Sequence, residues 1–111
     1  MKRGDFHWCD LDPTQGREQQ GHRPVLIVSE DAYHNGPAQL VIVVPVTTRR
    51  KRYPNRVGCP QTSRNGLALD SQVLSDQVRC ISTERIGRRI GTCEAAVFDG
   101  VVDDLRIVLG I

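Results

Sequence analysis

Short apolar runs separated by turn residues occupy most of the chain and predict β-strands. The clearest are residues 25–28 and 40–44, unbroken runs rich in β-branched side chains, which are typical of strands buried on both faces. Further strands are predicted over residues 6–11, 56–59, 67–69, 72–74 and 78–82. Because Pro45 has no N–H to donate, we expect the strand before it to reach a sheet edge or a bulge there. This many short strands predict a small barrel or sandwich rather than βαβ units.

The hydrophobic period changes near the C-terminus and predicts a helix. Apolar side chains recur there every three or four residues and form one wide stripe: Val97, Phe98, Val101, Val102, Leu105, Val108 and Leu109. Gly110 stands where a glycine commonly follows a helix, whereas Gly100 inside the run costs about 1 kcal/mol relative to alanine. The stripe predicts that this helix packs on the strands, so the fold class is mainly β (α+β) with a C-terminal helix.

At 111 residues, the chain is expected to form one domain over residues 1–111. Its longest apolar run is far shorter than the roughly 20 residues that span a bilayer, and the N-terminus lacks the apolar core of a signal peptide. The four cysteines are widely spaced and form no C-x-x-C pair, and the three histidines do not complete a zinc site. We therefore expect no metal, and free thiols buried as small hydrophobes in a reducing cytoplasm.

The net charge of +2 conceals an uneven distribution. No acidic residue occurs between Asp31 and Asp70, an interval with six basic residues. The rest of the chain therefore holds nine of the 15 basic residues and all 13 acidic ones, and is net acidic. The dense part, residues 49–56, includes Tyr53, and cations interleaved with an aromatic suit single-stranded nucleic acid through phosphate neutralisation and base stacking. A solvated loop kept soluble by charge is an equally good interpretation of this segment alone.

A second unusual segment, residues 16–24, is polar and bounded by glycines between two predicted strands. Pro24 favours an extended conformation for Arg23 at the start of the 25–28 strand, and an arginine fixed in this way offers a planar donor fork that matches phosphate oxygens. Taken by itself, the segment fits a plain polar hairpin loop better.

At these two loops the sequence resembles the MazF/PemK family of toxin endoribonucleases. The matching stretches run in order along essentially the whole chain: Lys2-Arg3-Gly4-Asp5, Trp8-Cys9-Asp10-Leu11-Asp12-Pro13, Gly16-x-Glu18-Gln19-x-Gly21-His22-Arg23-Pro24-Val25, Val44-Pro45-Val46-Thr47-Thr48, Lys51-x-Tyr53-Pro54, Gly66-Leu67-Ala68-Leu69, Asp76-Gln77-Val78-Arg79 and Ile90-Gly91. The long glycine-bounded loop is the most specific of them. The chain departs from the family at Cys93, where leucine is frequent, and in its more basic Arg49-Arg50 step.

The resemblance implies a small SH3-like β-barrel of the CcdB/MazF type with a C-terminal helix, assembled as a homodimer. It implies sequence-specific cleavage of single-stranded RNA, mainly messenger RNA, without metal or cofactor, by the growth-inhibiting toxin of a bacterial type II toxin–antitoxin system. It also implies a cytoplasmic location and a cognate antitoxin whose acidic, flexible tail occupies the RNA groove.

By the same resemblance, Arg23, Thr47 and Glu18 match catalytic positions, and the Glu18 carboxylate is expected to orient Arg23 or to accept a proton. RNA carries its own nucleophile, the 2′-OH, so the protein must align it, stabilise phosphoryl charge and move two protons. Arginine is a poor base because its pKa lies above about 12, and His22 should point away from Arg23 along an extended strand. The expected RNA-binding residues are Gln19, His22, Arg49, Arg50, Lys51, Gln77 and Arg79.

Other side chains are expected in the core: Phe6, Trp8, Leu69, Val73, Val78 and Ile81. Two functional alternatives stay open at the level of sequence. One is a non-enzymatic gyrase poison of the CcdB type, although the chain lacks the tryptophan near the C-terminus of that protein. The other is an RNA-binding barrel that has lost catalysis, against which the presence of Arg23, Thr47 and Glu18 argues.

Overall fold

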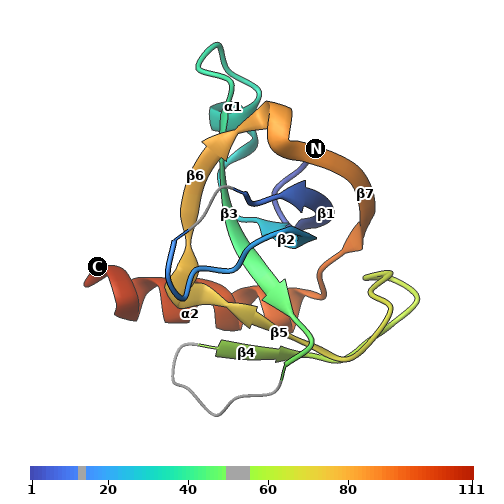
Figure 1. The fold of residues 1–111 in the computed structure, drawn as a ribbon. Helices are drawn as coiled ribbons and strands as arrows, with labels where there is room; N and C mark the ends of the chain where they lie inside the picture. The colour runs from blue at the N-terminus through green and yellow to red at the C-terminus, as the bar shows by residue number, and fades with distance from the viewer. Residues whose placement is uncertain (13–14, 50–55) are drawn as a thin grey trace.

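A computed structural model describes residues 1–12, 15–49 and 56–111, and within them the chain forms one curved antiparallel sheet and a long C-terminal helix (Figure 1). The elements follow one another as β1 (Asp5–Asp10), β2 (His22–Ile27), α1 (Asp31–His34), β3 (Leu40–Thr47), β4 (Arg56–Cys59), β5 (Ser71–Leu74), the 3-10 turn η1 (Ser75–Gln77), β6 (Arg79–Ser82), the 3-10 turn η2 (Thr83–Arg85), β7 (Ile86–Thr92) and α2 (Ala95–Leu109). Neither helix of these residues combines the length and the apolar character needed to cross a bilayer.

The strand order is β4-β5-β3-β2-β1-β7, and β6 pairs with the part of β3 that β5 leaves uncovered. The prediction of a mainly β fold with a C-terminal helix is confirmed. Closure into a barrel is not: among the described strands, β4 and β7 end the path without pairing with each other. The sheet is therefore a curved, open one, and the term SH3-like barrel describes its curvature only.

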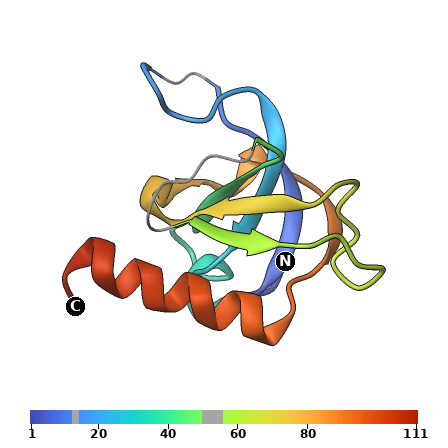
Figure 2. The same ribbon diagram turned by 90° about the horizontal axis from the view of Figure 1, so that it is seen from below.

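Alternating side chains give the sheet two apolar faces. Phe6, Leu26 and Val44 belong to one core cluster, against which Val97, Phe98 and Leu105 of α2 pack. Cys9, Val25, Val43 and Ile81 belong to a second cluster on the other face. Figure 2 shows α2 lying along one side of the sheet, with the β1–β2 loop projecting from the opposite side. The two faces explain why the strands at the centre of the sheet are unbroken apolar runs.

The predicted helix is confirmed and begins two residues before the first apolar position of the stripe. Gly110 ends it in the left-handed conformation at φ 71°, where its N–H and that of Ile111 bond to carbonyls of the last turn. Gly100 faces β4, since a Cβ built there would lie 3.4 Å from a Val57 methyl carbon. The glycine thus allows the helix to approach the sheet closely.

Most predicted strands are confirmed within a residue or a few, but one predicted strand is absent and one strand was missed. Residues 67–69 form no strand, and Leu69 is 61% exposed rather than part of the core. β7 was missed because its sequence is largely glycine and arginine on the exposed side. At Pro45, β3 passes from β6, which pairs up to Val43, to β5, which pairs from Val46, so the ladder on this side of β3 is interrupted there, in keeping with the expected edge or bulge. The 3-10 turn η1, which joins β5 to β6, lies at this interruption. A residue without an N–H is tolerated there because no ladder hydrogen bond is lost.

One buried amide, that of Asn65, connects the 60–67 loop with the start of α2. Asn65 is fully buried, and its Oδ1 accepts hydrogen bonds from the backbone N–H groups of Thr62 and Leu67, both at 3.1 Å. Its Nδ2 donates to the Pro60 carbonyl at 2.9 Å and to the Glu94 carboxylate at 3.0 Å. The Thr62 hydroxyl, together with this amide, holds the pKa of Glu94 below its usual value.

Replacing Asn65 with alanine should lower the free energy of unfolding by about 2–4 kcal/mol, because buried backbone groups and a carboxylate lose their partner. Urea titration at fixed protein concentration measures the change. Ser63→Ala in the same exposed loop is the matched control and should stay within about 0.5 kcal/mol of wild type. Equal stability of the two variants would contradict the assigned role of Asn65.

The four cysteines are free thiols, of which Cys9, Cys59 and Cys93 are buried, as expected, and Cys80 is exposed, contrary to expectation. Burial raises the pKa of the Cys9 thiol to about 11. A hydrogen bond links the thiols of Cys59 and Cys93 and raises the pKa of Cys93, which burial raises further. Reactivity should therefore be concentrated at Cys80.

With a disulfide reagent at pH 8, the folded protein should release one equivalent of chromophore quickly and the other three only after unfolding. Access favours Cys80, the exposed thiol of the four, so Cys80→Ser should abolish the fast phase. Two or more fast thiols in the native protein would show that the buried cysteines are accessible.

Candidate active site

The start of β2 and the end of β3 bring two of the predicted catalytic residues to one place. The ladder pairs Val25 with Pro45 and Ile27 with Val43, and Arg23 and Thr47 each lie two residues beyond the Val25–Pro45 pair, near the start of β2 and at the end of β3. Residues two apart along a strand, and residues paired across an antiparallel ladder, project their side chains to the same face. That face is the one that carries Val25 and Val43, so the pair borders the second apolar cluster.

Thr47 and Arg23 are restrained to different degrees. Thr47 is 3% exposed, and its Oγ1 accepts a hydrogen bond from the Arg49 N–H at 3.2 Å. Arg23 is half-buried, and its Nε donates to the Gln20 carbonyl at 2.7 Å. The two terminal guanidinium nitrogens of Arg23 make no hydrogen bond to the described residues, so they are available for an anion. The end of β3 thus supplies a fixed hydroxyl, and the start of β2 supplies an arginine whose terminal nitrogens have no hydrogen bond to the described residues.

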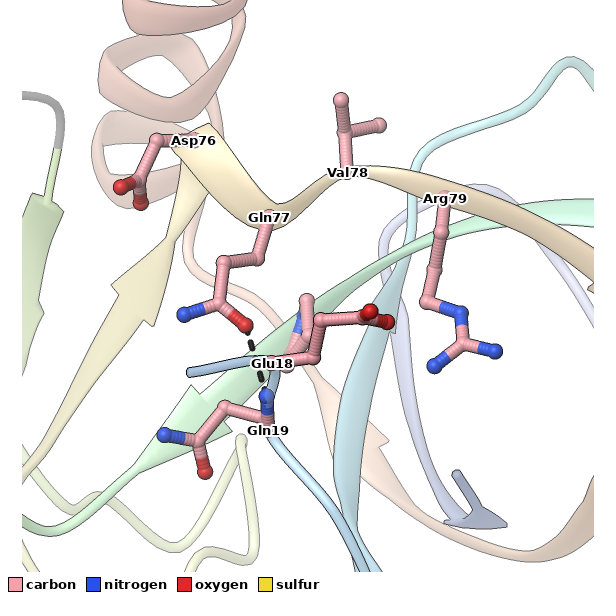
Figure 3. Close-up of a pocket in the computed structure, with 7 residues that line it drawn as sticks. Glu18, Gln19, Asp76, Gln77, Val78 and Arg79 are labelled. Atoms are coloured by element: carbon pink, nitrogen blue, oxygen red, sulfur yellow. Dashed lines mark hydrogen bonds between the residues drawn. The ribbon is translucent and has the colours of Figure 1, made fainter. Parts of the chain in front are cut away.

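A depression of about 250 Å³ opens beside this pair, at the join between the β1–β2 loop and the η1–β6 segment. Its lining is mostly polar: Glu18, Gln19, Pro45, Asp76, Gln77, Val78 and Arg79. Pro45 shares the face of Thr47, two residues away on β3, and so connects the depression with the pair. In Figure 3 the Gln77 side chain reaches across to the loop, where its Oε1 accepts the Gln19 N–H at 2.8 Å.

Glu18 lies in the depression and not on Arg23. Figure 3 shows its carboxylate turned to the side of the depression that holds Arg79. The expectation that Glu18 orients Arg23 is therefore wrong for this structure, since the Gln20 carbonyl takes that place. Its carboxylate faces open space within the depression, where it can accept a proton from a bound molecule.

His22 lies on the other face of the sheet, as its neighbour position predicts. Its ring stacks on the Trp8 indole with centroids 5.2 Å apart and planes 7° from parallel. Trp8 is accordingly half-buried and partnered by a histidine, unlike Phe6, which is fully buried; placing Trp8 in the core was wrong. The structure does not bring His22 together with Arg23 and Thr47.

The remaining predicted contacts are split between the depression and the basic loop. Gln19, Gln77 and Arg79 line the depression. Arg49 is exposed directly after β3, whereas Arg50 and Lys51 lie outside the described residues. No three His, Cys, Asp or Glu side chains of the described part are grouped so as to hold a metal ion.

Sequence reasoning missed three polar residues in or next to the candidate site. Asp76 lines the depression and lies 3.7 Å from the Arg56 guanidinium. Gln72 on β5 pairs with Thr47, which places it on the same face. Arg85 donates to the Asp12 carbonyl at 3.0 Å at the base of the β1–β2 loop. Asp76 stands in a quoted motif, but nothing in the sequence distinguishes Gln72 or Arg85 from other polar residues.

Residues 2–109 match the family described as PemK-like, MazF-like toxin of type II toxin-antitoxin system. Endoribonuclease toxin MazF of Escherichia coli is 44% identical over 72 residues, which is 65% of this chain and 64% of that protein, just under two thirds of its length. Endoribonuclease MazF9 of Mycobacterium tuberculosis is 35% identical over 116 residues, covering 100% of this chain and 98% of its own.

Similarity extends to solved structures. The crystal structure of MazF from Deinococcus radiodurans superposes with a TM-score of 0.87 at 31% identity, covering 100% of this chain and 97% of that one. A MazE-MazF crystal structure from the same organism matches at 31% identity with a TM-score of 0.79, covering 100% and 96% of the two chains.

Proposed function

This chain belongs to the family of PemK-like, MazF-like toxins of type II toxin-antitoxin systems, and on that premise we propose that it is a sequence-specific endoribonuclease acting on single-stranded RNA, mainly messenger RNA. The observation that supports the proposal is that Arg23 and Thr47 each lie two residues beyond the Val25–Pro45 pair, next to a depression lined mostly by polar residues. Sites built on strands hold their geometry better than sites on loops alone.

In the proposed reaction the RNA supplies the nucleophile. The 2′-oxygen bonds to the adjacent phosphorus while the bond from phosphorus to the 5′-oxygen breaks, leaving a 2′,3′-cyclic phosphate and a 5′-OH. Arg23 would hold two phosphoryl oxygens with its free terminal nitrogens, where the negative charge grows. Thr47 would fix the same phosphate through its hydroxyl, so that the 2′-oxygen, phosphorus and leaving oxygen align.

Two protons must move, and Glu18 is the residue we assign to one of them. Its carboxylate faces the depression, where the 2′-OH of a bound nucleotide can reach it. Gln19, Gln77 and Arg79 would bind the nucleotide in the depression, and Arg49, with Arg50 and Lys51, would neutralise the phosphates along the strand. His22 stacks on Trp8 on the other face of the sheet, so it would contact the RNA only if the RNA also reached that face.

The proposal extends to assembly and partners. Family membership supports a homodimer in the bacterial cytoplasm and a cognate antitoxin, and a MazE-MazF complex of a relative supports direct binding of that antitoxin. An acidic, flexible antitoxin segment complements the same cations that would bind RNA. Toxicity by messenger RNA cleavage would inhibit growth when the antitoxin is absent.

Arg23→Ala should reduce cleavage of a long mixed single-stranded RNA by at least about 100-fold, because removing one preorganised charge contact at a transition state costs on this scale. Arg88→Ala, which removes an exposed arginine on β7, is the matched control and should cleave like wild type. Both variants should keep the wild-type Tm and circular dichroism. Undiminished cleavage by Arg23→Ala would remove that residue from the mechanism.

Because the nucleophile belongs to the RNA, wild-type cleavage should be unchanged within about twofold when EDTA is in excess over divalent ions. Sequencing the cut ends in both conditions measures activity and recognition sequence together. Loss of cleavage in EDTA that Mg²⁺ restores would contradict the metal-independent route. Binding without cleavage, or inhibition of gyrase supercoiling without RNA cleavage, would support the inactive RNA-binding barrel or the gyrase poison instead.

A further inference from the structure

The β1–β2 loop is buried at its start, where Leu11 belongs to the second apolar cluster, but is exposed where it carries part of the candidate site. Glu18 and Gln20 are exposed and Gln19 is half-buried. Fixing the backbone of each residue costs about 1–2 kcal/mol in conformational entropy, so the largely exposed residues 15–20 need restraints other than burial to hold a fixed geometry. Hydrogen bonds to its main chain are the restraints that the structure provides.

The two ends of the loop are first tied to each other. The Leu11 N–H donates to the Gly21 carbonyl at 3.0 Å, and the Gly21 N–H donates to the Asp12 carboxylate at 3.0 Å. These bonds close the base of the loop but do not set its direction relative to β3 and β6.

Three side chains from the continuous segment η1–β6–η2 supply that direction. Arg79 on β6 donates to the Leu11 carbonyl at 3.3 Å, and Arg85 on η2 donates to the Asp12 carbonyl at 3.0 Å. Gln77 on η1 accepts from the Gln19 N–H. All three contacts end on main-chain atoms, and two cations converge on successive carbonyls of the chain as it leaves β1.

Arg85 differs from the other two because it does not line the depression. Arg85 is half-buried, whereas its neighbour Glu84 is exposed. Among the described residues, Arg85 donates its hydrogen bond to the Asp12 carbonyl. Its function is therefore separable from RNA binding in a way that those of Gln77 and Arg79 are not.

The loop in turn holds the catalytic arginine. The Gln20 carbonyl that accepts the Arg23 Nε lies on this loop, two residues after Glu18. Movement of the loop would thus displace both the carboxylate and the guanidinium relative to Thr47, which is fixed separately in β3.

We propose that Arg85 is a positioning residue of the active site, which fastens the β1–β2 loop to the η2 turn and so sets Glu18 and Arg23 relative to Thr47. The inference rests on the proposed endoribonuclease function for its effect on rate, whereas the fastening itself is a property of the folded chain.

The test compares Arg85→Met, Arg85→Lys and the control Arg88→Ala in the full-length protein. Arg85→Met retains the aliphatic stem but has no donor, so hydrogen exchange at the Gln19 and Gly21 amides, followed by NMR, should accelerate at least about tenfold. RNA cleavage should lose about tenfold in kcat with less than a twofold change in KM, since the depression is intact. Arg85→Lys, which can still donate to the carbonyl, should recover most of both values.

The Cys93 amide, which donates to the Gly4 carbonyl at 2.8 Å, is the internal reference, and its exchange should be unchanged in every variant. Unaltered exchange at Gln19 and Gly21 in Arg85→Met would overturn the fastening role. Faster exchange with full cleavage would overturn the positioning role. If wild-type protein cut no RNA, the proposed function would fail, while the exchange data would still decide whether Arg85 holds the loop.

Discussion

The antiparallel register between β2 and β3 is the constraint from which the other features follow. It pairs Val25 with Pro45, and because side chains alternate, it assigns every residue of both strands to one of two faces. One face receives Leu26 and Val44 and is covered by α2, while the other receives Val25 and Val43. A slip of one residue would exchange the two sets and would also separate Arg23 from Thr47. The same strand register therefore determines both the packing of the core and the arrangement of the candidate site.

Packing around this pair of strands depends on close backbone approach and on one buried amide. A Cβ on Gly91 would lie 2.4 Å from the Asn65 backbone, and one on Gly66 would lie 2.3 Å from the Ile90 carbonyl oxygen. The 60–67 loop can therefore lie directly on β7, with Asn65 satisfying the groups buried beneath it. These contacts are remote from the depression and hold the end of the sheet from which α2 starts.

Much of the fold was predictable because long apolar runs and a wide helical stripe leave few alternatives. β7 was not, since its arginines and glycines give no alternation, and it becomes a strand only because β1 offers an unpaired edge. Motif positions led to Arg23, Thr47 and the residues of the depression. They did not reveal that Gln20 rather than Glu18 holds Arg23, or that His22 stacks on Trp8, because both depend on side-chain direction. The contact of Arg85 with Asp12 spans 73 residues between a side chain and a carbonyl, which no local pattern encodes.

The three bonds that fasten the β1–β2 loop all terminate on its peptide groups, not on its side chains. A peptide group is the same whichever residue carries it. Mutations at the exposed positions 15, 17, 18 and 20 therefore leave the anchoring intact while changing the chemical surface shown to a ligand, whereas Gly16, at φ 61°, is needed for the turn itself. Such a loop can change the side chains that it presents without changing its shape.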